Sequence, residues 1–116
     1  MTKPHKISIP MAELSGIPTL IPLPAAGGIP QTAIVFLLAG EPKAYLNRCR
    51  HHPIPLDSGS GEVMSQDRIH LMCHTHGALY RREDGYCTEG PCEGLSLLSL
   101  RIVRTATGWE LEVPAL

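Results

Sequence analysis

The chain has 116 residues, which is enough for about one domain with a single hydrophobic core. Its 10 Lys and Arg residues and 11 Asp and Glu residues give a formal net charge of −1. This balance excludes a strong electrostatic field that would attract nucleic acid or an anionic membrane surface. We therefore expect no nucleic-acid partner and no membrane partner, and we expect protein partners to be recognised through local contacts.

The termini and the apolar runs carry no sign of export or of a membrane span. The first ten residues, MTKPHKISIP, contain neither an apolar signal core nor a small-residue cleavage site. The longest unbroken apolar run, AIVFLLAG at 33–40, falls far below the roughly 20 residues that a spanning helix needs, so we interpret it as a buried strand. Four cysteines without an export signal favour reduced thiols and metal ligands over disulfides. These features predict a cytoplasmic protein.

Short runs typical of β-strands recur along the chain, whereas 11 glycines and 11 prolines interrupt every apolar pattern of helical period. In chain order, the predicted strands are 6–9 (KISI), 33–38 (AIVFLL), 43–47 (KAYLN), 69–73 (IHLMC), 95–104 (LSLLSLRIVR) and 108–113 (GWELEV). Turn signals separate them at 39–42, 57–61, 83–85 and 107–108. We predict an all-β fold, a small antiparallel sandwich or barrel of about eight to ten short strands in one domain, residues 1–116.

The two last predicted strands allow a more detailed expectation. In 95–104, Leu98, Leu100 and Ile102 occupy alternate positions, which is typical of a half-buried strand. We expect Trp109 to lie in the core or at its rim and not in a functional site.

Two short segments concentrate side chains that can bind a metal. Cys49 and His51 form a C-x-H pattern, Cys73 and His76 form a C-x-x-H pattern, and 21 residues separate His51 from Cys73. Each segment follows a predicted strand, so two facing hairpin tips could close a four-ligand site. Structural zinc is one interpretation, because zinc accepts two sulfur and two nitrogen ligands. Zinc modules usually keep cysteines and histidines on separate elements, however, so the mixed loops favour a binuclear cluster with one iron bound by each ligand type.

These motifs resemble the cluster loops of Rieske [2Fe–2S] domains. CRHHPIPLD at 49–57 is similar to the C-x-H first loop of that family, and CHTHGALY at 73–80 is similar to its C-x-x-H-G second loop. EDGYCTEGPCEGLSLLSLRIV at 83–103 resembles the stretch that follows, including the Gly-Pro loop that lies over the cluster in the family. The resemblance covers roughly residues 33–113. The ligand spacing is wider than usual, which we attribute to a longer hairpin at 57–68.

The resemblance implies one Rieske-type [2Fe–2S] cluster in a cluster-binding part at about 47–94. Cys49 and Cys73 would bind one iron, and His51 and His76 would bind the other. Two neutral imidazoles in place of two thiolates raise the reduction potential above that of an all-cysteine cluster. The imidazole edges, exposed in the family, would be the port for electrons. Reduction would then become coupled to proton uptake at alkaline pH.

The chain departs from the respiratory and photosynthetic members of the family at three positions. Ala78 stands where those members carry a serine, and Ile54 and Thr75 stand where they carry a disulfide that joins the loops. Tyr80 matches their tyrosine and could donate a hydrogen bond to a ligand sulfur. The resemblance therefore implies a low-potential ferredoxin, near the lower end of the range of about −150 to +300 mV for Rieske centres.

Other metal-capable residues receive structural roles. Cys87 and Cys92 flank the Gly90-Pro91 turn and could be further ligands, a disulfide or a redox switch, but we predict packed free thiols. Four histidines are expected not to bind the cluster: His5, His52, His70 and His74.

Three functional classes remain open, the first two from the resemblance and the third as an alternative to it. The first is a soluble one-electron carrier that passes electrons from a flavin-dependent reductase to a terminal oxygenase or another oxidoreductase. The second is a small subunit of a larger enzyme, such as the Rieske-like component of nitrite reductase, and the third is a zinc-stabilised binding module. An oxygenase in its own right is not expected, because it needs a second domain with mononuclear iron. We predict the first function, an electron-transfer protein that is not an enzyme.

Overall fold

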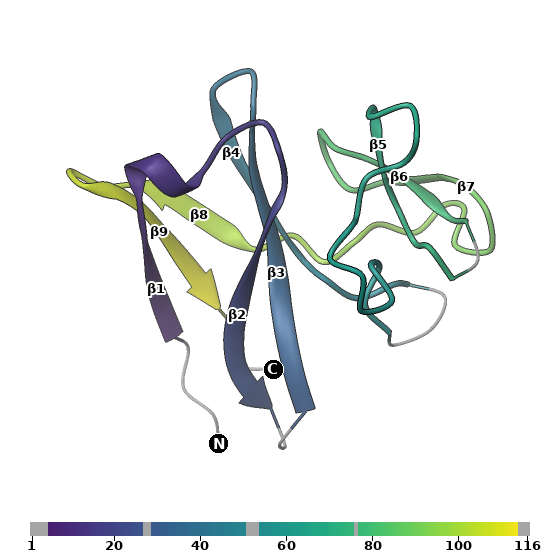
Figure 1. The fold of residues 1–116 in the computed structure, drawn as a ribbon, viewed down its shortest axis with the longest axis horizontal. Coiled ribbons are helices and arrows are strands. Elements are labelled where there is room, and N and C mark those ends of the chain that lie inside the picture. Colours follow the sequence, from purple (N-terminus) through teal and green to yellow (C-terminus); the bar gives the residue numbers. More distant parts are fainter. Residues whose placement is uncertain (1–4, 27–28, 51–53, 76, 114–116) are drawn as a thin grey trace. The chain divides into compact units, whose positions relative to one another are not determined.

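The computed structural model describes residues 5–26, 29–50, 54–75 and 77–113. The chain forms two compact units (Figure 1). The sheet unit comprises Met1–Leu46 and Leu100–Leu116, and the loop unit comprises Asn47–Ser99. Within the described ranges, no helix is long and apolar enough to cross a bilayer.

Two antiparallel three-stranded sheets make up the sheet unit, with strand orders β1-β9-β8 and β2-β3-β4 (Figure 1). A short 3-10 helix, η1, follows β1. The bounds of these elements are β1 His5–Pro10, η1 Met11–Glu13, β2 Thr19–Ala26, β3 Ile29–Leu38, β4 Glu41–Leu46, β8 Arg101–Arg104 and β9 Gly108–Val113. The Leu100 N–H donates to the Ala44 carbonyl at 2.8 Å and so ties the segment before β8 to β4.

The tight turn between β3 and β4 follows directly from its sequence. Leu38 pairs with Glu41, which leaves the two-residue loop Ala39-Gly40. Both loop residues have positive φ, 52° at Ala39 and 82° at Gly40. Positive φ at both central positions is the requirement of the hairpin turns that match strand twist, and glycine meets it without strain. The predicted turn at 39–42 is confirmed.

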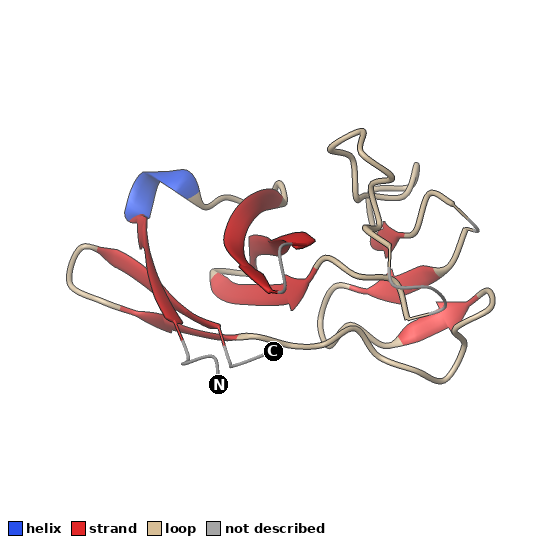
Figure 2. Ribbon diagram, turned by 90° about the horizontal axis from the view of Figure 1, so that it is seen from below, coloured by secondary structure: helices blue, strands red, loops and turns tan. Residues whose placement is uncertain are grey.

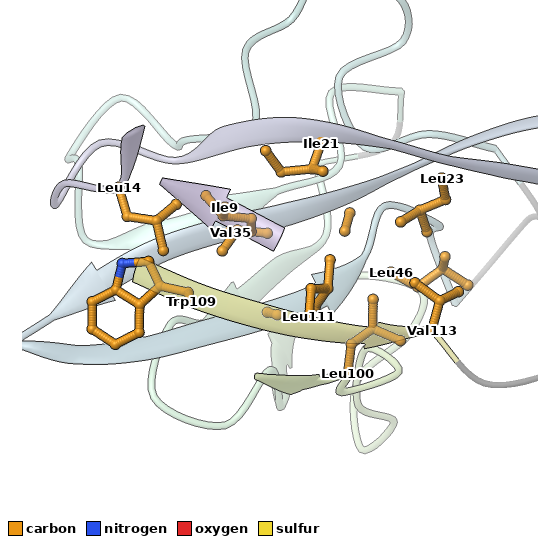
Figure 3. Close-up of a cluster of buried hydrophobic side chains, with 12 residues drawn as sticks. Ile9, Leu14, Ile21, Leu23, Val35, Leu46, Leu100, Trp109, Leu111 and Val113 are labelled. Atoms are coloured by element: carbon orange, nitrogen blue, oxygen red, sulfur yellow. The ribbon is translucent and has the colours of Figure 1, made fainter. Parts of the chain in front are cut away.

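The hydrophobic core of the sheet unit takes side chains from both sheets. On β9, Trp109, Leu111 and Val113 alternate with the partly exposed Glu110 and Glu112, as expected when one face of a strand is buried. Figure 3 shows these β9 side chains grouped with those of β2 and β3. The buried members of the cluster are Ile9, Leu14, Ile21, Leu23, Ala33, Val35, Ala44, Leu46, Leu100, Trp109, Leu111 and Val113. The expectation that Trp109 is a core residue is confirmed.

The loop unit contains one small antiparallel sheet with the order β5-β6-β7, and most of its chain is loop (Figure 2). Its strands are β5 His70–Met72, β6 Leu79–Arg81 and β7 Cys87–Glu89. An isolated bridge between Met64 and Leu71 adds a partner beside β5. The largest fully buried side chains of this unit are Leu56, Leu71, Cys73, Tyr80, Cys87 and Cys92. Three of these six are cysteines, so thiols form a large share of the interior.

The predicted all-β fold is confirmed, with nine strands in the described residues. The strand predicted at 95–104 is wrong in its first half, because β8 begins only at Arg101. Residues 95–97 instead bind β7 and its neighbours: the Cys87 N–H donates to the Leu95 carbonyl at 2.7 Å, and Ser96 forms a single bridge. Leu98, expected to be inward, is 42% exposed.

Strand β2 was not predicted, because Pro22 and Pro24 interrupt its sequence. The strand lies at the edge of its sheet, where a residue without an N–H is tolerated, and both prolines are exposed. The three-residue strands β6 and β7 were also missed, since so short a run gives no periodic signal.

Candidate metal centre

The two cysteine motifs form loops that are closed in the same way. The Cys49 N–H donates to the carbonyl of Ile54 at 2.8 Å, and the Cys73 N–H donates to the carbonyl of Ala78 at 2.9 Å. In both cases the hydrogen bond joins the cysteine to the residue five positions later. We call residues 49–54 the first loop and residues 73–78 the second loop. Each of the two predicted metal-binding motifs therefore lies in a loop that begins with a thiol.

Local sequence explains how each loop leaves its strand. The second loop starts directly after β5, and the Gly77 N–H donates back to the Cys73 carbonyl at 2.8 Å. Gly77 has φ 76°, a conformation that glycine adopts without strain. The first loop starts three residues after β4 ends at Leu46, and Pro55, which directly follows the loop, has no N–H to donate to a helix or a central strand.

Both cysteine sulfurs of the predicted ligand set are buried. Cys49 is 4% exposed and Cys73 is 0% exposed, whereas His74 beside them is exposed. His51 and His76, the predicted imidazole ligands, lie outside the described residues, as does His52. Among the residues that are described, no group of three or more His, Cys, Asp or Glu side chains is arranged to hold a metal ion.

Hydrogen bonds join the second loop to the segment that follows the first. The His74 N–H donates to the Leu56 carbonyl at 2.9 Å. The hydroxyls of Ser58 and Thr75 lie 2.7 Å apart, a second and exposed hydrogen bond between the same segments. Thr75 stands at one of the two positions where other members of the resembled family carry a disulfide. Here the hydrogen bond between Ser58 and Thr75 joins the segments at that residue.

A buried polar network fixes the segment after the first loop. The Asn47 side-chain oxygen accepts from the Leu56 N–H at 2.8 Å, and its amide nitrogen donates to Asp57 at 3.0 Å. The other Asp57 oxygen accepts from the Gly61 N–H at 2.9 Å. Burial opposes ionisation of Asp57, but the hydrogen bonds from Asn47 and Gly61 outweigh it and hold the pKa below the ordinary value of 3.8.

Tyr80 on β6 directs its hydroxyl to the first loop. The ring is fully buried, and its Oη lies 3.5 Å from the Cys49 Sγ. The Arg50 N–H donates to the same phenol oxygen at 3.2 Å, which leaves the phenol hydrogen for the sulfur. Burial, followed by the hydrogen bond to Cys49, raises the pKa of Tyr80 far above its ordinary value of 10.0. The phenol is therefore a neutral donor at physiological pH.

The two remaining cysteines are buried free thiols, as predicted. The Cys87 thiol donates to the Glu89 carbonyl at 3.2 Å. Cys92 instead lies beside the first loop, with its Sγ 3.8 Å from the Cys49 Sγ. Burial is the main cause that raises the pKa of both thiols. Sequence reasoning missed the contact between Cys92 and Cys49, because 43 residues separate them and no spacing rule links them.

The Gly-Pro turn packs directly on the second loop. Gly90 has φ 99°, and a Cβ built on it would lie 2.8 Å from the Cα of Ala78. Any other residue at position 90 would therefore displace one of the two segments. The same approach explains why a small residue suits position 78, which is fully buried.

This donor set fits an iron–sulfur cluster. Thiolates are the ligands that such clusters require, and the two loops each begin with a buried thiol. The Cys49 sulfur also has a neighbouring hydroxyl and a neighbouring thiol, which are the kinds of group that hydrogen-bond to cluster sulfurs. The described half of the set therefore supplies the sulfur side of the expected site.

Comparisons with known proteins give the same indication. The family model for the Rieske [2Fe-2S] domain matches residues 24–104. No curated protein sequence matches significantly. Three solved structures each match 98% of this chain, and at their identities, all under 25%, the likeness shows a shared fold.

The terminal oxygenase of carbazole 1,9a-dioxygenase from Novosphingobium sp. KA1 is 17% identical with a TM-score of 0.71, and the chain spans 30% of its length. The reduced complex between oxygenase and ferredoxin in carbazole 1,9a-dioxygenase gives 18% identity, a TM-score of 0.74 and 29% coverage of the matched chain. The ferredoxin of carbazole 1,9a-dioxygenase from Nocardioides aromaticivorans IC177 is 23% identical with a TM-score of 0.66, and all of that chain is covered.

Proposed function

The chain belongs to the Rieske [2Fe–2S] domain family, and from that premise we propose that it is a one-electron carrier whose cluster is held by Cys49, His51, Cys73 and His76. The observation that carries the proposal is the matched pair of loops, each opened by a buried cysteine and closed by a hydrogen bond over five residues. When bound, the cluster supplies a centre that gains and loses a single electron. The zinc-stabilised binding module is disfavoured, since the family cofactor is iron and sulfide.

Each described residue has a defined part in this proposal. Cys49 and Cys73 bind through their thiolates and keep the sulfur side of the site away from water. Tyr80 donates a hydrogen bond to the Cys49 sulfur, and the Asn47 network holds the segment to which the second loop is tied. These contacts hold Cys49 and the segment joined to the second loop in place, which would limit rearrangement when a bound cluster gained or lost an electron. The carrier itself performs no substrate chemistry.

We propose a single Rieske domain over residues 1–116, with the cluster-binding part at about 47–94. The loop unit, Asn47–Ser99, supports that boundary because it contains both cysteine loops and the Gly-Pro turn. In chain order, β4 of the sheet unit leads into the first loop.

The partners in this proposal are redox proteins. Solved neighbours include a complex between the oxygenase and the ferredoxin of carbazole 1,9a-dioxygenase, so a comparable role here is delivery of electrons to a terminal oxygenase or another oxidoreductase. A flavin-dependent reductase would supply the electrons. The near-neutral net charge of −1 supports partners other than nucleic acid or membranes, and we place the carrier in the cytoplasm.

A second candidate is the Rieske part of a larger oxidoreductase. The terminal oxygenase from Novosphingobium sp. KA1 contains the same fold in 30% of its chain, with a TM-score of 0.71. In such a setting the cluster would relay electrons inside an assembly. A freestanding carrier is reduced by a reductase and then reoxidised in bimolecular steps, so its reoxidation rate rises linearly with the concentration of added oxygenase.

The decisive experiment is an optical and EPR spectrum of the purified protein before and after dithionite, with iron and acid-labile sulfide determined on the same sample. We expect equal amounts of iron and sulfide and a rhombic signal that appears on reduction. A colourless sample that contains zinc and no sulfide would overturn the proposal. Cys49→Ser and Cys73→Ser should lose the signal, whereas Cys87→Ala is the matched control that should keep it.

A further inference from the structure

The Cys92 thiol lies against a proposed ligand without being one. Its sulfur is 3.8 Å from the Cys49 sulfur, and both side chains are buried, at 1% and 4% exposure. A ligand role for Cys92 would exceed the two-cysteine set of the family, so its place in the loop unit needs another explanation. Its contact with the Cys49 sulfur suggests an effect on that sulfur.

Backbone hydrogen bonds hold the thiol where it is. The Glu93 N–H donates to the Gly90 carbonyl at 3.1 Å, and the Leu95 N–H donates to the Cys92 carbonyl at 2.9 Å. The Gly94 N–H donates to the carbonyl of Cys87 on β7 at 3.2 Å. The turn is therefore anchored to the sheet of the loop unit on one side and packed on Ala78 on the other. The backbone that carries Cys92 is therefore held on two sides, which keeps the residue beside Cys49.

Metal binding decides which sulfur donates. A cysteine that binds iron is a thiolate and has no hydrogen to donate, whereas Cys92 lies outside the proposed ligand set and carries an S–H. The hydrogen bond between these sulfurs must then run from Cys92 to Cys49. Tyr80 approaches the same sulfur, with its Oη at 3.5 Å. The Cys49 sulfur thus has two neutral donors, one from β6 and one from the Gly-Pro turn.

We infer that Cys92 is a second hydrogen-bond donor to the Cys49 sulfur and that it raises the reduction potential of the cluster. This inference rests on the proposed ligand role of Cys49. One added electron makes the ligand sulfurs more negative, and a donor to a sulfur then binds more strongly, which favours the reduced state. Cys92 acts through Cys49, so its effect is on the potential and not on the number of irons bound.

The test compares midpoint potentials of the reconstituted protein by film voltammetry. Cys92→Ala and Cys92→Val both remove the donor, and Val keeps most of the volume in case the smaller residue prevents folding. We expect a lower potential in both, and a value nearer to wild type in Cys92→Ser, which retains a hydrogen. Cys87→Ala is the matched control. The Cys87 thiol donates to a backbone carbonyl, so its removal should leave the potential unchanged.

The outcomes separate this inference from the proposed function. Variants at position 92 that keep the cluster spectrum and the wild-type potential would overturn the role of Cys92 while the carrier function stands. A larger decrease in the double variant Cys92→Ala with Tyr80→Phe than in either single variant would support a donor role for both side chains. A wild-type protein that never shows the cluster spectrum would overturn the function and the inference together.

Discussion

The side-chain oxygen of Asn47 accepts a hydrogen bond from the Leu56 N–H at 2.8 Å, and both residues are buried. Asn47→Ala would leave that N–H without a partner and would also remove the donor to Asp57. We expect a loss of about 2–3 kcal/mol in the free energy of unfolding, because a buried unsatisfied donor costs about 1–3 kcal/mol. Urea titration followed by circular dichroism measures it.

Ser58→Ala is the matched control for that variant. It removes the exposed hydrogen bond to Thr75 between the same segments and should cost less than about 0.5 kcal/mol. Equal losses in the two variants would show that burial does not govern the strength of this connection.

Two glycines with similar backbone conformations separate strain from steric contact. Gly90 and Gly94 have φ 99° and 92°, but only Gly90 lies against a neighbour, with 2.8 Å from its ideal Cβ position to the Ala78 Cα. Gly94→Ala should cost about 1–2 kcal/mol from backbone strain alone. Gly90→Ala should cost at least about 1 kcal/mol more, because the turn must also move off the second loop. Denaturant midpoints of both variants give the difference, and identical values would exclude close packing at Gly90.

The sequence predicted those features that depend on local patterns. Alternation of apolar and polar residues identified β9, and the cysteine spacing identified two loops that the structure shows to be closed alike. Strand β2 was not predicted, because prolines disrupt the hydrogen bonds of a central strand but are tolerated in an edge strand. Whether a strand lies at an edge depends on the whole sheet and cannot be read from a local pattern. Cys92 could not be placed beside Cys49, since their contact depends on the path of the Gly90 turn. The histidine ligands stay a prediction, because His51 and His76 lie outside the described residues.

Acid should weaken the turn before β5 through Asp67. Hydrogen bonds from the Ser65 hydroxyl and the Ile69 N–H lower the pKa of Asp67 from 3.8 to about 2. A folded-state pKa below the unfolded value contributes stability above pH about 4, and that contribution is lost as the pH falls through about 2. Asp67→Asn should therefore lower the urea midpoint near neutral pH and have little effect near pH 2. A constant difference across this range would contradict the assignment.

At alkaline pH, the raised pKa of Tyr80 should make the free energy of unfolding depend on pH. Its burial, and then its hydrogen bond to Cys49, raise its pKa well above 10.0, so the folded protein keeps this phenol neutral after an unfolded chain would release the proton. Stability linked to a raised pKa is complete below the unfolded value and declines as the pH rises above it. Between pH about 10 and 11, the free energy of unfolding of the wild type should therefore fall faster than that of Tyr80→Phe, by up to about 1.4 kcal/mol per pH unit.

Urea unfolding at stepped alkaline pH measures both slopes, and Tyr86→Phe, which changes an exposed ring, should keep the wild-type slope. Parallel slopes in wild type and Tyr80→Phe would show that the phenol ionises in the folded state and cannot be the fixed donor that the Cys49 sulfur requires.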